Sequence, residues 1–153
     1  NKDGWPKSQM KTFIDNDIYN SLPNDLKGVI ITTETVSGRG SEDTNNFTST
    51  DKLYLLSTAE IWAQGTSNTI DYDAARGKTR QLDYYKSKGV TTGDYADAIK
   101  NNSSGTASLW WLRCANSNTN TGFYAVAING NWSGSITTVA RNTYGVSPAF
   151  RIG

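Results

Sequence analysis

The acidic side chains are the first candidates for chemistry, because a pair of carboxylates can act as acid and base in glycoside hydrolysis. Glu34, Glu42 and Glu60 lie in the N-terminal part of the chain, with several aspartates nearby. Their spacing favours no carboxylate pair, and Glu60 follows Ser57 by three positions, as in a helix capping box. We interpret these acids as surface charge and a helix cap. A hydrolase that uses the N-terminal Asp and Glu residues remains an alternative.

Metal and nucleophile chemistry have few candidate residues. Residues 15–17 (DND) and Asp25 do not form the acid series that an EF-hand loop requires. The sugar-and-calcium triplets Glu-Pro-Asn, Gln-Pro-Asp and Trp-Asn-Asp are missing from the sequence. The chain has no His and a single cysteine, Cys114, which excludes an internal disulfide, a Cys-based zinc site and any Ser-His-Asp or Cys-His constellation within the chain. The sequence therefore predicts no cofactor, and it predicts Cys114 as a small buried side chain.

The overall charge argues against two classes of partner. The 153 residues carry a formal net charge of +1, and the small basic cluster at 76–80 (RGKTR) has no interleaved aromatics. We therefore expect no nucleic-acid binding. No apolar run approaches the roughly 18 residues of a membrane span, so we expect no membrane insertion by this domain. A signal peptide and an initiator Met are both missing, which predicts that Asn1 begins a trimmed or mature fragment.

The C-terminal third is almost free of titratable side chains. From residue 101 to 153 there is no Lys, Asp, Glu, Gln, His or Met, and the only charges are Arg113, Arg141 and Arg151. Such a segment cannot supply general acid–base catalysis, which needs titratable groups. It can supply a neutral surface of hydroxyls, amides and aromatic rings. We interpret it as a binding surface and predict that the protein is not an enzyme.

The elements that must hold this surface can be read in chain order. Trp5-Pro6 predicts an extended lead-in, because proline disfavours helix at the preceding residue. Ser8 is the expected N-cap of an amphipathic helix that runs to about Tyr19. The other elements expected in this half are a short helix after 22–26 that ends at Gly28, a strand over 29–36, a loop over 37–49, a buried strand over 53–56 and a brief helix capped by Ser57.

Strands dominate the second half. Residues 95–100 predict a helical turn, and strands are expected near 108–114, 123–129, 135–140 and 144–151, with a turn at Asn129-Gly130. Helices early and strands late indicate an α+β fold rather than alternating βαβ units. We expect one domain over residues 1–153, with N-terminal helices packed on a small, mostly antiparallel sheet and long irregular loops.

Three motifs carry a resemblance to a known family. They are 51–57 (DKLYLLS), 110–113 (WWLR) and 145–150 (GVSPAF). The chain resembles an uncharacterised domain of bacterial and phage surface proteins, related to the C-type-lectin fold, whose members show DK-aromatic-LLS, WWLRS and GVRPAF. It departs from that pattern at Cys114, where Ser is usual, and at Ser147, where Arg is usual. The resemblance implies a C-type-lectin-like ligand-binding (receptor or adhesin-type) domain on a cell surface, in the extracellular space or on a phage virion.

Some members of this fold are variable proteins of diversity-generating retroelements, in which template adenines are replaced at random. Asn codons then become codons for a restricted set of residues that excludes Lys, Glu, Gln, Met and Trp. The segment of about 114–145 holds only residues of that set, Trp132 excepted. The resemblance implies that this segment is diversified. Alternatives are a non-diversified carbohydrate-binding or cell-wall-associated module, and a passive stalk or pilus-tip module.

The expected binding face lies within residues 116–144 and points outward from alternating strands, with an unknown protein or glycan as its ligand. Its aromatic members could stack on a sugar or anchor a protein partner. The residues expected on this face are Asn116, Asn118, Thr119, Asn120, Tyr124, Trp132, Ser133, Ser135, Thr137, Arg141, Asn142 and Tyr144. The residues expected to form the fixed framework beneath it are Trp110, Trp111, Leu112, Val126, Ile128, Val146 and Phe150.

Overall fold

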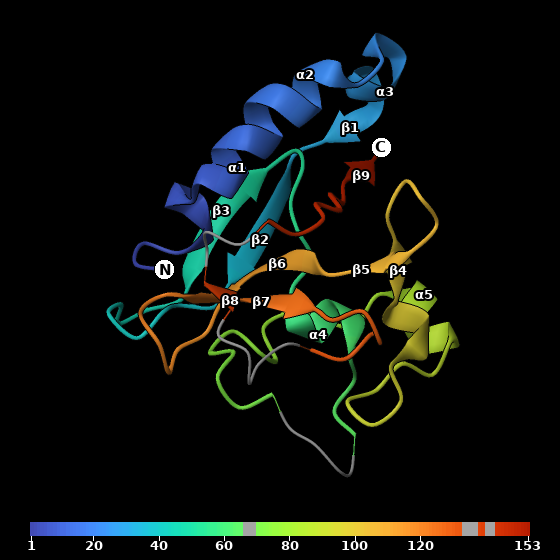
Figure 1. Ribbon diagram of the computed structural model, residues 1–153. Coiled ribbons are helices and arrows are strands. Elements are labelled where there is room, and N and C mark those ends of the chain that lie inside the picture. The colour runs from blue at the N-terminus through green and yellow to red at the C-terminus, as the bar shows by residue number, and fades with distance from the viewer. Residues whose placement is uncertain (66–69, 133–137, 140–142) are drawn as a thin grey trace.

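The N-terminal helical segment begins where the sequence predicts. A computed structural model describes residues 1–65, 70–132, 138–139 and 143–153 (Figure 1). The side-chain oxygen of Ser8 accepts a hydrogen bond from the backbone N–H of Lys11 at 3.1 Å, which confirms Ser8 as an N-cap. The helical segment that follows consists of α1 (Gln9–Phe13), the π-helical turn η2 (Ile14–Ile18) and α2 (Tyr19–Ser21).

The segment before this helix, Trp5-Pro6, differs from the prediction. Trp5 and Pro6 are not extended but belong to a 3₁₀ turn, η1 (Trp5–Lys7). Proline is compatible with the first turn of a helix, because its fixed φ is already helical and its missing N–H has no partner there. The turn buries the Trp5 ring, whose Nε1 donates to the carboxylate of Asp51 at 3.3 Å. Tertiary packing of one tryptophan thus overrides the local preference.

The next elements form an antiparallel hairpin and a short pair of strands. The helix α3 (Asn24–Val29) runs one residue past Gly28, where we expected its end. The expected strand over 29–36 is present as β1 (Ile30–Ile31) and β2 (Thr33–Ser37). The loop expected over 37–49 is wrong at its end, because β3 (Phe47–Asp51) pairs with β2 in register from Thr33↔Asp51 to Ser37↔Phe47.

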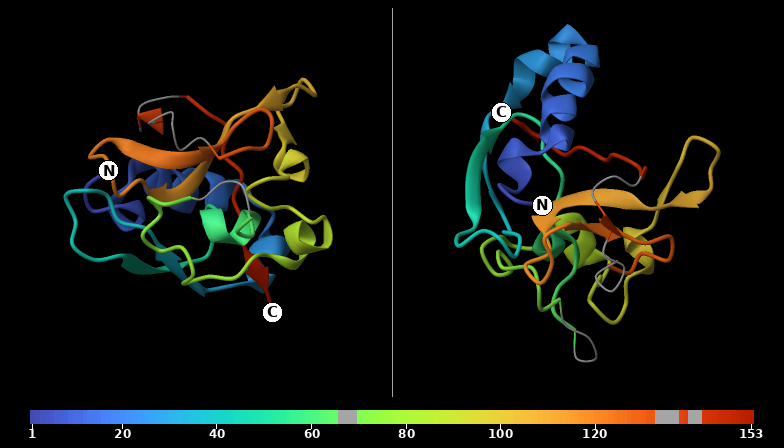
Figure 2. Two further views of the ribbon diagram at one scale, coloured as in Figure 1. Left: turned by 90° about the horizontal axis from the view of Figure 1, so that it is seen from below. Right: turned by 60° about the vertical axis from the view of Figure 1, so that its left-hand side comes forward.

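The central part of the chain is mostly irregular. Residues 53–56 are buried as expected, but their main chain makes only one bridge, between Tyr54 and Ala149. The capping box at Ser57 and Glu60 is confirmed at the start of α4 (Thr58–Ile61). The remaining elements before the main sheet are α5 (Asp83–Ser87), the 3₁₀ turn η3 (Ala96–Ala98) within the helical turn expected over 95–100, and a hairpin of β4 (Lys100–Asn101) and β5 (Ala107–Ser108). This hairpin projects from the body (Figures 1 and 2).

The main sheet is built by the C-terminal third. Its three antiparallel strands are β6 (Trp110–Ala115), β7 (Gly122–Val126) and β8 (Thr138–Val139), in that order. Every residue of β6 is buried, because both faces of the sheet are covered. The N-terminal helical segment lies over one face, and α4 lies on the other side of the sheet (Figures 1 and 2).

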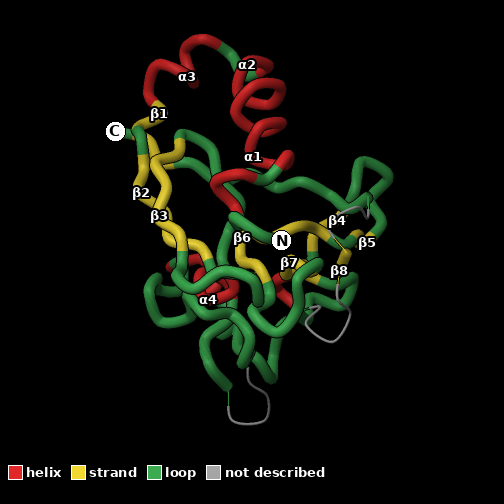
Figure 3. Tube along the Cα trace, turned by 90° about the vertical axis from the view of Figure 1, so that its left-hand side faces the viewer, coloured by secondary structure: helices red, strands yellow, loops and turns green. Residues whose placement is uncertain are grey.

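The strand expected over 144–151 is largely absent as a strand. Gly145 and Ala149 make isolated bridges to Trp110 and Tyr54, and only β9 (Arg151–Ile152) is regular. It pairs with β1 and brings the C-terminal end beside it (Figure 3). Of the strand expected near 135–140, the described part is β8. The fold is α+β with small antiparallel sheets and few helices. Within the described residues, no helix has the length and apolar character needed to cross a membrane.

Candidate functional site

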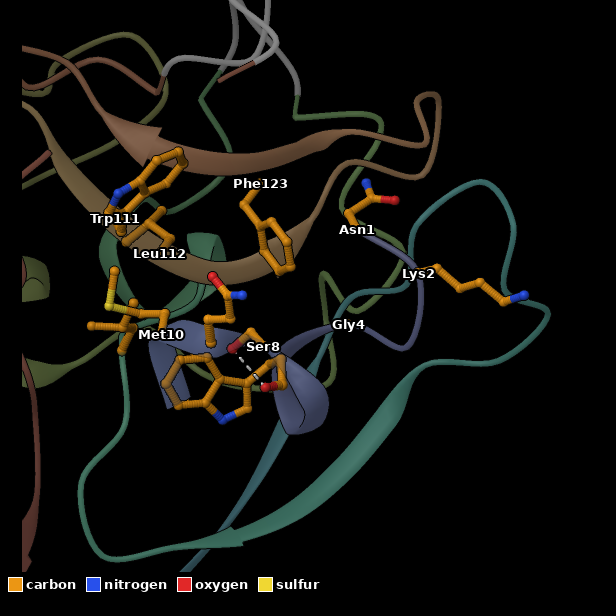
Figure 4. Close-up of a pocket in the computed structure, with 11 residues that line it drawn as sticks. Asn1, Lys2, Gly4, Ser8, Met10, Trp111, Leu112 and Phe123 are labelled. Atoms are coloured by element: carbon orange, nitrogen blue, oxygen red, sulfur yellow. Dashed lines mark hydrogen bonds between the residues drawn. The ribbon is translucent and has the colours of Figure 1, made fainter. Parts of the chain in front are cut away.

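A cavity of about 240 Å³ lies between the start of the helical segment and one face of the β6–β7 sheet (Figure 4). Its buried lining is apolar, with Trp5, Leu55, Trp111 and Leu112. Met10 and Phe123 are partly buried and complete the apolar wall. The other lining residues are Asn1, Lys2, Gly4, Ser8 and Gln9. The amine of Lys2 points away from the cavity (Figure 4), and the N-terminal ammonium of Asn1 donates to the carbonyl of Asn120 at 2.8 Å.

Strand alternation explains why the sheet contributes these rings. Trp111 pairs with Ala125, and Phe123 lies two positions before Ala125 on β7, so the two aromatic side chains share a face. The register is irregular between Trp111 and Ala115, and Leu112 also lines the cavity. The opposite wall comes from η1 and α1. Segments that are distant along the chain therefore lie together at this cavity, and no local sequence pattern predicts that they do.

Asn1 joins the cavity to the turn between β6 and β7. Its side-chain amide donates to the carbonyl oxygens of Asn116, Thr119 and Gly122 at 3.2, 3.0 and 2.7 Å. These acceptors belong to the main chain, so the turn is held whatever side chains it carries. Gly40 lies close against Asn1, since a Cβ at Gly40 would be 2.1 Å from the Oδ1 atom. This role of Asn1 cannot be predicted from the sequence, because a single asparagine outside any motif gives no local signal.

The turn presents part of the expected binding face. Asn118 and Asn120 are exposed, and Thr119 is half-buried. Asn116 corrects the expectation, because it is 5% exposed and its Oδ1 accepts from the N–H of Asn118 at 2.9 Å. It is a structural residue of the turn. Thr121, which we did not single out, is exposed beside Asn120.

Tyr124 also differs from the expected binding face. We expected it to point outward, but only 2% of the side chain is exposed. It follows Phe123 on β7 and so faces the other side of the sheet, where Asp73 and Cys114 lie near it. Burial, together with the nearby charge of Asp73, raises the pKa of the Tyr124 hydroxyl. A side chain in this position supports the fold and is not available to a ligand.

The two other aromatic residues of the expected face are half-buried and stack on the core. Tyr144 contacts Trp111, with ring centroids 4.7 Å apart, and so lies next to the cavity lining. Trp132 meets Trp62 edge to face at 6.2 Å. The remaining members of that face lie outside the described residues; they are Ser133, Ser135, Thr137, Arg141 and Asn142.

The framework expected beneath the face is correct in its centre and wrong at its edges. Trp110, Trp111, Leu112 and Val126 are buried, and Val146 packs against the core. Ile128 and Phe150 are instead 56% and 40% exposed. Ile128 lies beyond the end of β7 and Phe150 precedes the short β9, so neither is covered by a neighbouring layer.

Titratable groups near the sheet are engaged in the fold. Glu60, which the sequence identifies as a helix cap, also forms a buried ion pair with Arg113 at 2.6 Å. Cys114 is fully buried as expected, and burial raises the pKa of its thiol. Among the residues that the structure describes, no group of three or more His, Cys, Asp or Glu side chains is arranged to hold a metal ion.

The fold and the cavity define a small α+β domain with an uncharged, apolar cavity beside a neutral turn. The entire chain, residues 1–153, matches the family described as Domain of unknown function (DUF6273), and the protein belongs to that family. No curated protein and no solved structure matches the chain.

Proposed function

We propose that this protein is a non-enzymatic ligand-binding domain, displayed on a bacterial cell or phage surface, whose ligand is a protein or a glycan. The described part of its binding surface would be the apolar cavity and the exposed side chains of Asn118, Asn120 and Thr121. The observation that carries the proposal is their adjacency: Asn1 lines the cavity and holds the turn through main-chain carbonyls. Concave apolar sites with a few polar groups at the edge are typical of ligand binding.

The same surface offers little for catalysis. General acid–base chemistry needs a titratable group within hydrogen-bond reach of the substrate. The titratable groups of the cavity-lining residues are the Lys2 amine, which points away (Figure 4), and the N-terminal amine of Asn1, which donates to the carbonyl of Asn120 at 2.8 Å. Glu60, an acid that a hydrolase could have used, has both oxygens bonded to Arg113. These observations favour binding over hydrolysis.

The finer proposal is a C-type-lectin-like domain whose segment of about 114–145 is diversified. Support comes from the way the turn is held, because hydrogen bonds to main-chain oxygens survive any change of the exposed side chains. Asn116 and Tyr124 are buried, so we exclude them from the varied set. The test is the flanking DNA: a near-copy of the coding region that differs only at adenines, beside a reverse transcriptase gene. A flanking sequence without that near-copy would contradict diversification and leave the binding proposal intact.

The binding proposal is tested by probing arrays of surface proteins and glycans with the labelled domain. We compare the wild type with a variant in which Asn118, Asn120 and Thr121 are all replaced by Ala. At least one array ligand should bind the wild type, and the variant should bind it roughly tenfold or more weakly, because a few interface side chains, each costing over about 1 kcal/mol on truncation, carry most of the binding energy. Affinity should change little between low and moderate salt, since Asn118, Asn120 and Thr121 are uncharged and the two charged groups bonded to Asn120, the N-terminal ammonium and the Glu42 carboxylate, have opposite signs.

The matched control changes a second neutral, exposed loop. Ser103, Ser104 and Thr106, in the β4–β5 hairpin, are replaced by Ala, and binding should remain at the wild-type level. Equal loss in both variants, or a steep fall of affinity with salt, would contradict the proposed surface. Turnover of an array ligand that is abolished by single substitutions of the N-terminal acids would favour the hydrolase instead.

A further inference from the structure

We infer that the cavity between η1, α1 and the β6–β7 sheet binds one aromatic side chain of a protein ligand. The inference rests on the proposed function and names the chemical class of the ligand. It starts from the size of the cavity. A buried apolar cavity of about 150 Å³ accommodates benzene, whereas pockets for whole drug-sized ligands measure about 300–1,000 Å³. The cavity here, about 240 Å³, lies between these limits and fits a single ring system.

The lining selects an aromatic group over a charged one. The rings of Trp5, Trp111 and Phe123 surround the space together with the thioether of Met10 (Figure 4). Aromatic pairs gain energy beyond area burial, and a methionine sulfur contacts aromatic rings favourably. A charged group would lose its hydration in this cavity, while the Lys2 amine points away and the N-terminal ammonium of Asn1 is bonded to the Asn120 carbonyl.

Hydrogen-bonding capacity argues against a sugar ring. Most carbons of a sugar carry a hydroxyl, and each buried hydroxyl needs a partner. The Oγ of Ser8 already donates to the carbonyl of Trp5 at 2.9 Å and accepts from the N–H of Lys11 at 3.1 Å. The side-chain NH2 of Asn1 already donates to three carbonyls of the turn, and its Oδ1, which has no partner among the described residues, lies against Gly40. The exposed amide of Gln9 remains for a polar atom at the edge, such as a peptide group or an indole N–H.

The surface around the cavity indicates that the aromatic ring belongs to a protein ligand. One ring in a space of this size cannot account for a whole ligand. The rest of the ligand must lie on the adjoining surface, where the turn offers the neutral side chains of Asn118, Asn120 and Thr121. A buried aromatic anchor with adaptable polar contacts around it is the usual composition of a protein–protein hot spot.

The experiment uses N-acetyl-tryptophan amide as the probe and methyl-labelled methionine as the reporter. Met10 is the only methionine in the sequence, so its methyl resonance needs no further assignment. We expect a saturable shift of this resonance and NOEs from the indole ring to the Met10 methyl group. N-acetyl-alanine amide and methyl glucoside at the same concentrations should produce neither effect. The inference is overturned if the indole probe gives no shift up to millimolar concentration, or if methyl glucoside competes with it.

Two variants make the test specific. Met10→Trp fills the cavity and should weaken binding of a fluorinated indole probe, followed by fluorine NMR, at least tenfold. Ile128→Trp adds the same side chain on the exposed turn after β7, outside the cavity lining, and should bind the probe like the wild type. Equal binding by all three proteins would contradict the inference. Because the NOEs are measured in the wild type, the test remains decisive even if Met10→Trp fails to fold.

Failure of the inference can be told apart from failure of the proposed function. If an array ligand is lost on changing the turn but binds unchanged to folded Met10→Trp, the cavity is not the aromatic site and the binding function stands. If no array ligand depends on the turn, the proposed function falls, whatever the probe does.

Discussion

Arg113 and Glu60 form an ion pair inside the protein, where a charge without a partner would be costly. The guanidinium bonds both carboxylate oxygens at 2.6 and 2.9 Å and also donates to the carbonyls of Leu55 and Val36 at 2.7 and 3.0 Å. Burial alone lowers the pKa of Arg113, but the hydrogen bonds and charge of Glu60 outweigh it and raise that pKa. One side chain thus ties β6 to α4, to β2 and to the 53–56 segment beside α4.

We expect Arg113→Met to lower the free energy of unfolding by about 3–5 kcal/mol, because it leaves the Glu60 carboxylate buried and unpaired. Urea denaturation followed by tryptophan fluorescence measures the change. The control is Arg80→Met, which removes an exposed ion pair with Asp83 and should cost less than about 1 kcal/mol. Similar losses in the two variants would show that the buried pair contributes no more than a surface pair.

Asp51 is the second buried charge, and it docks the N-terminal segment on the β2–β3 hairpin. Its carboxylate accepts from Trp5, from Ser49 at 2.8 Å and from Thr35, and it pairs with Lys11. Burial alone raises the pKa of Asp51, but the hydrogen bonds from Lys11, Thr35 and Ser49 outweigh it, and the net pKa is lowered.

The lowered pKa of Asp51 makes stability depend on pH in a defined direction. The contribution is fully present above the unfolded-state pKa of about 3.9 and is lost as pH falls through the lower folded-state pKa. Asp51→Asn should therefore cost roughly 2–3 kcal/mol at neutral pH. The gap to the wild type should narrow as the pH falls below about 4. Urea unfolding at a series of pH values measures this, with exposed Asp83→Asn as the control that should follow the wild type. A constant gap across the acid range would contradict the role of Asp51.

At the scale of elements, the turn after β7 shows how a local signal meets a tertiary constraint. Asn129-Gly130 is a turn, as the dipeptide predicts, with Gly130 at a φ of 87° and its N–H donating to the carbonyl of Ala127 at 2.9 Å. The carbonyl of Gly130 accepts from the indole of Trp62 at 3.1 Å. A Cβ at this glycine would lie 2.0 Å from the carbonyl oxygen of Tyr95. The sequence predicts the turn, but it does not predict that the main chain at Tyr95 packs against it.

Gly130→Ala should therefore destabilise the protein by more than about 3 kcal/mol, because backbone strain and a clash with another main chain add together. Thermal and urea unfolding measure the loss. Gly77→Ala isolates the strain alone, since Gly77 has a φ of 89° and nothing within 4 Å of its Cβ position. It should cost about 1–2 kcal/mol. A loss at Gly130 that does not exceed the loss at Gly77 would refute the close packing of this turn.

At the scale of the whole molecule, distant parts of the chain close on one another. Asn1 holds the turn at 116–122, β1 pairs with β9, and Tyr54 bridges Ala149. The candidate site is a product of this closure, because its walls come from the first ten residues and from the β6–β7 sheet. A cavity built in this way cannot be found by searching one segment of the sequence.

The sequence alone determined the features that depend on neighbours in the chain. Ser8 as an N-cap, the Ser57–Glu60 capping box and the Asn129-Gly130 turn follow from local hydrogen bonds, and the buried centre of β6 follows from its continuous apolar run. The motif around Trp110 and Trp111 likewise predicted a core strand. The sequence as a whole also predicted an α+β domain with small antiparallel sheets, because that class follows from the kinds and order of the elements.

Only the tertiary structure decided which side chains of the C-terminal third are exposed and which are buried. Alternation puts Phe123 and Tyr124 on opposite faces of β7, but it cannot tell which face is covered. Here both faces are covered, one by the N-terminal helical segment and the other by α4, so Tyr124 is buried and Phe123 lines a cavity. That outcome depends on contacts between residues separated by over a hundred positions, such as the hydrogen bond from Asn1 to Gly122. Periodicity within one strand contains no information about them.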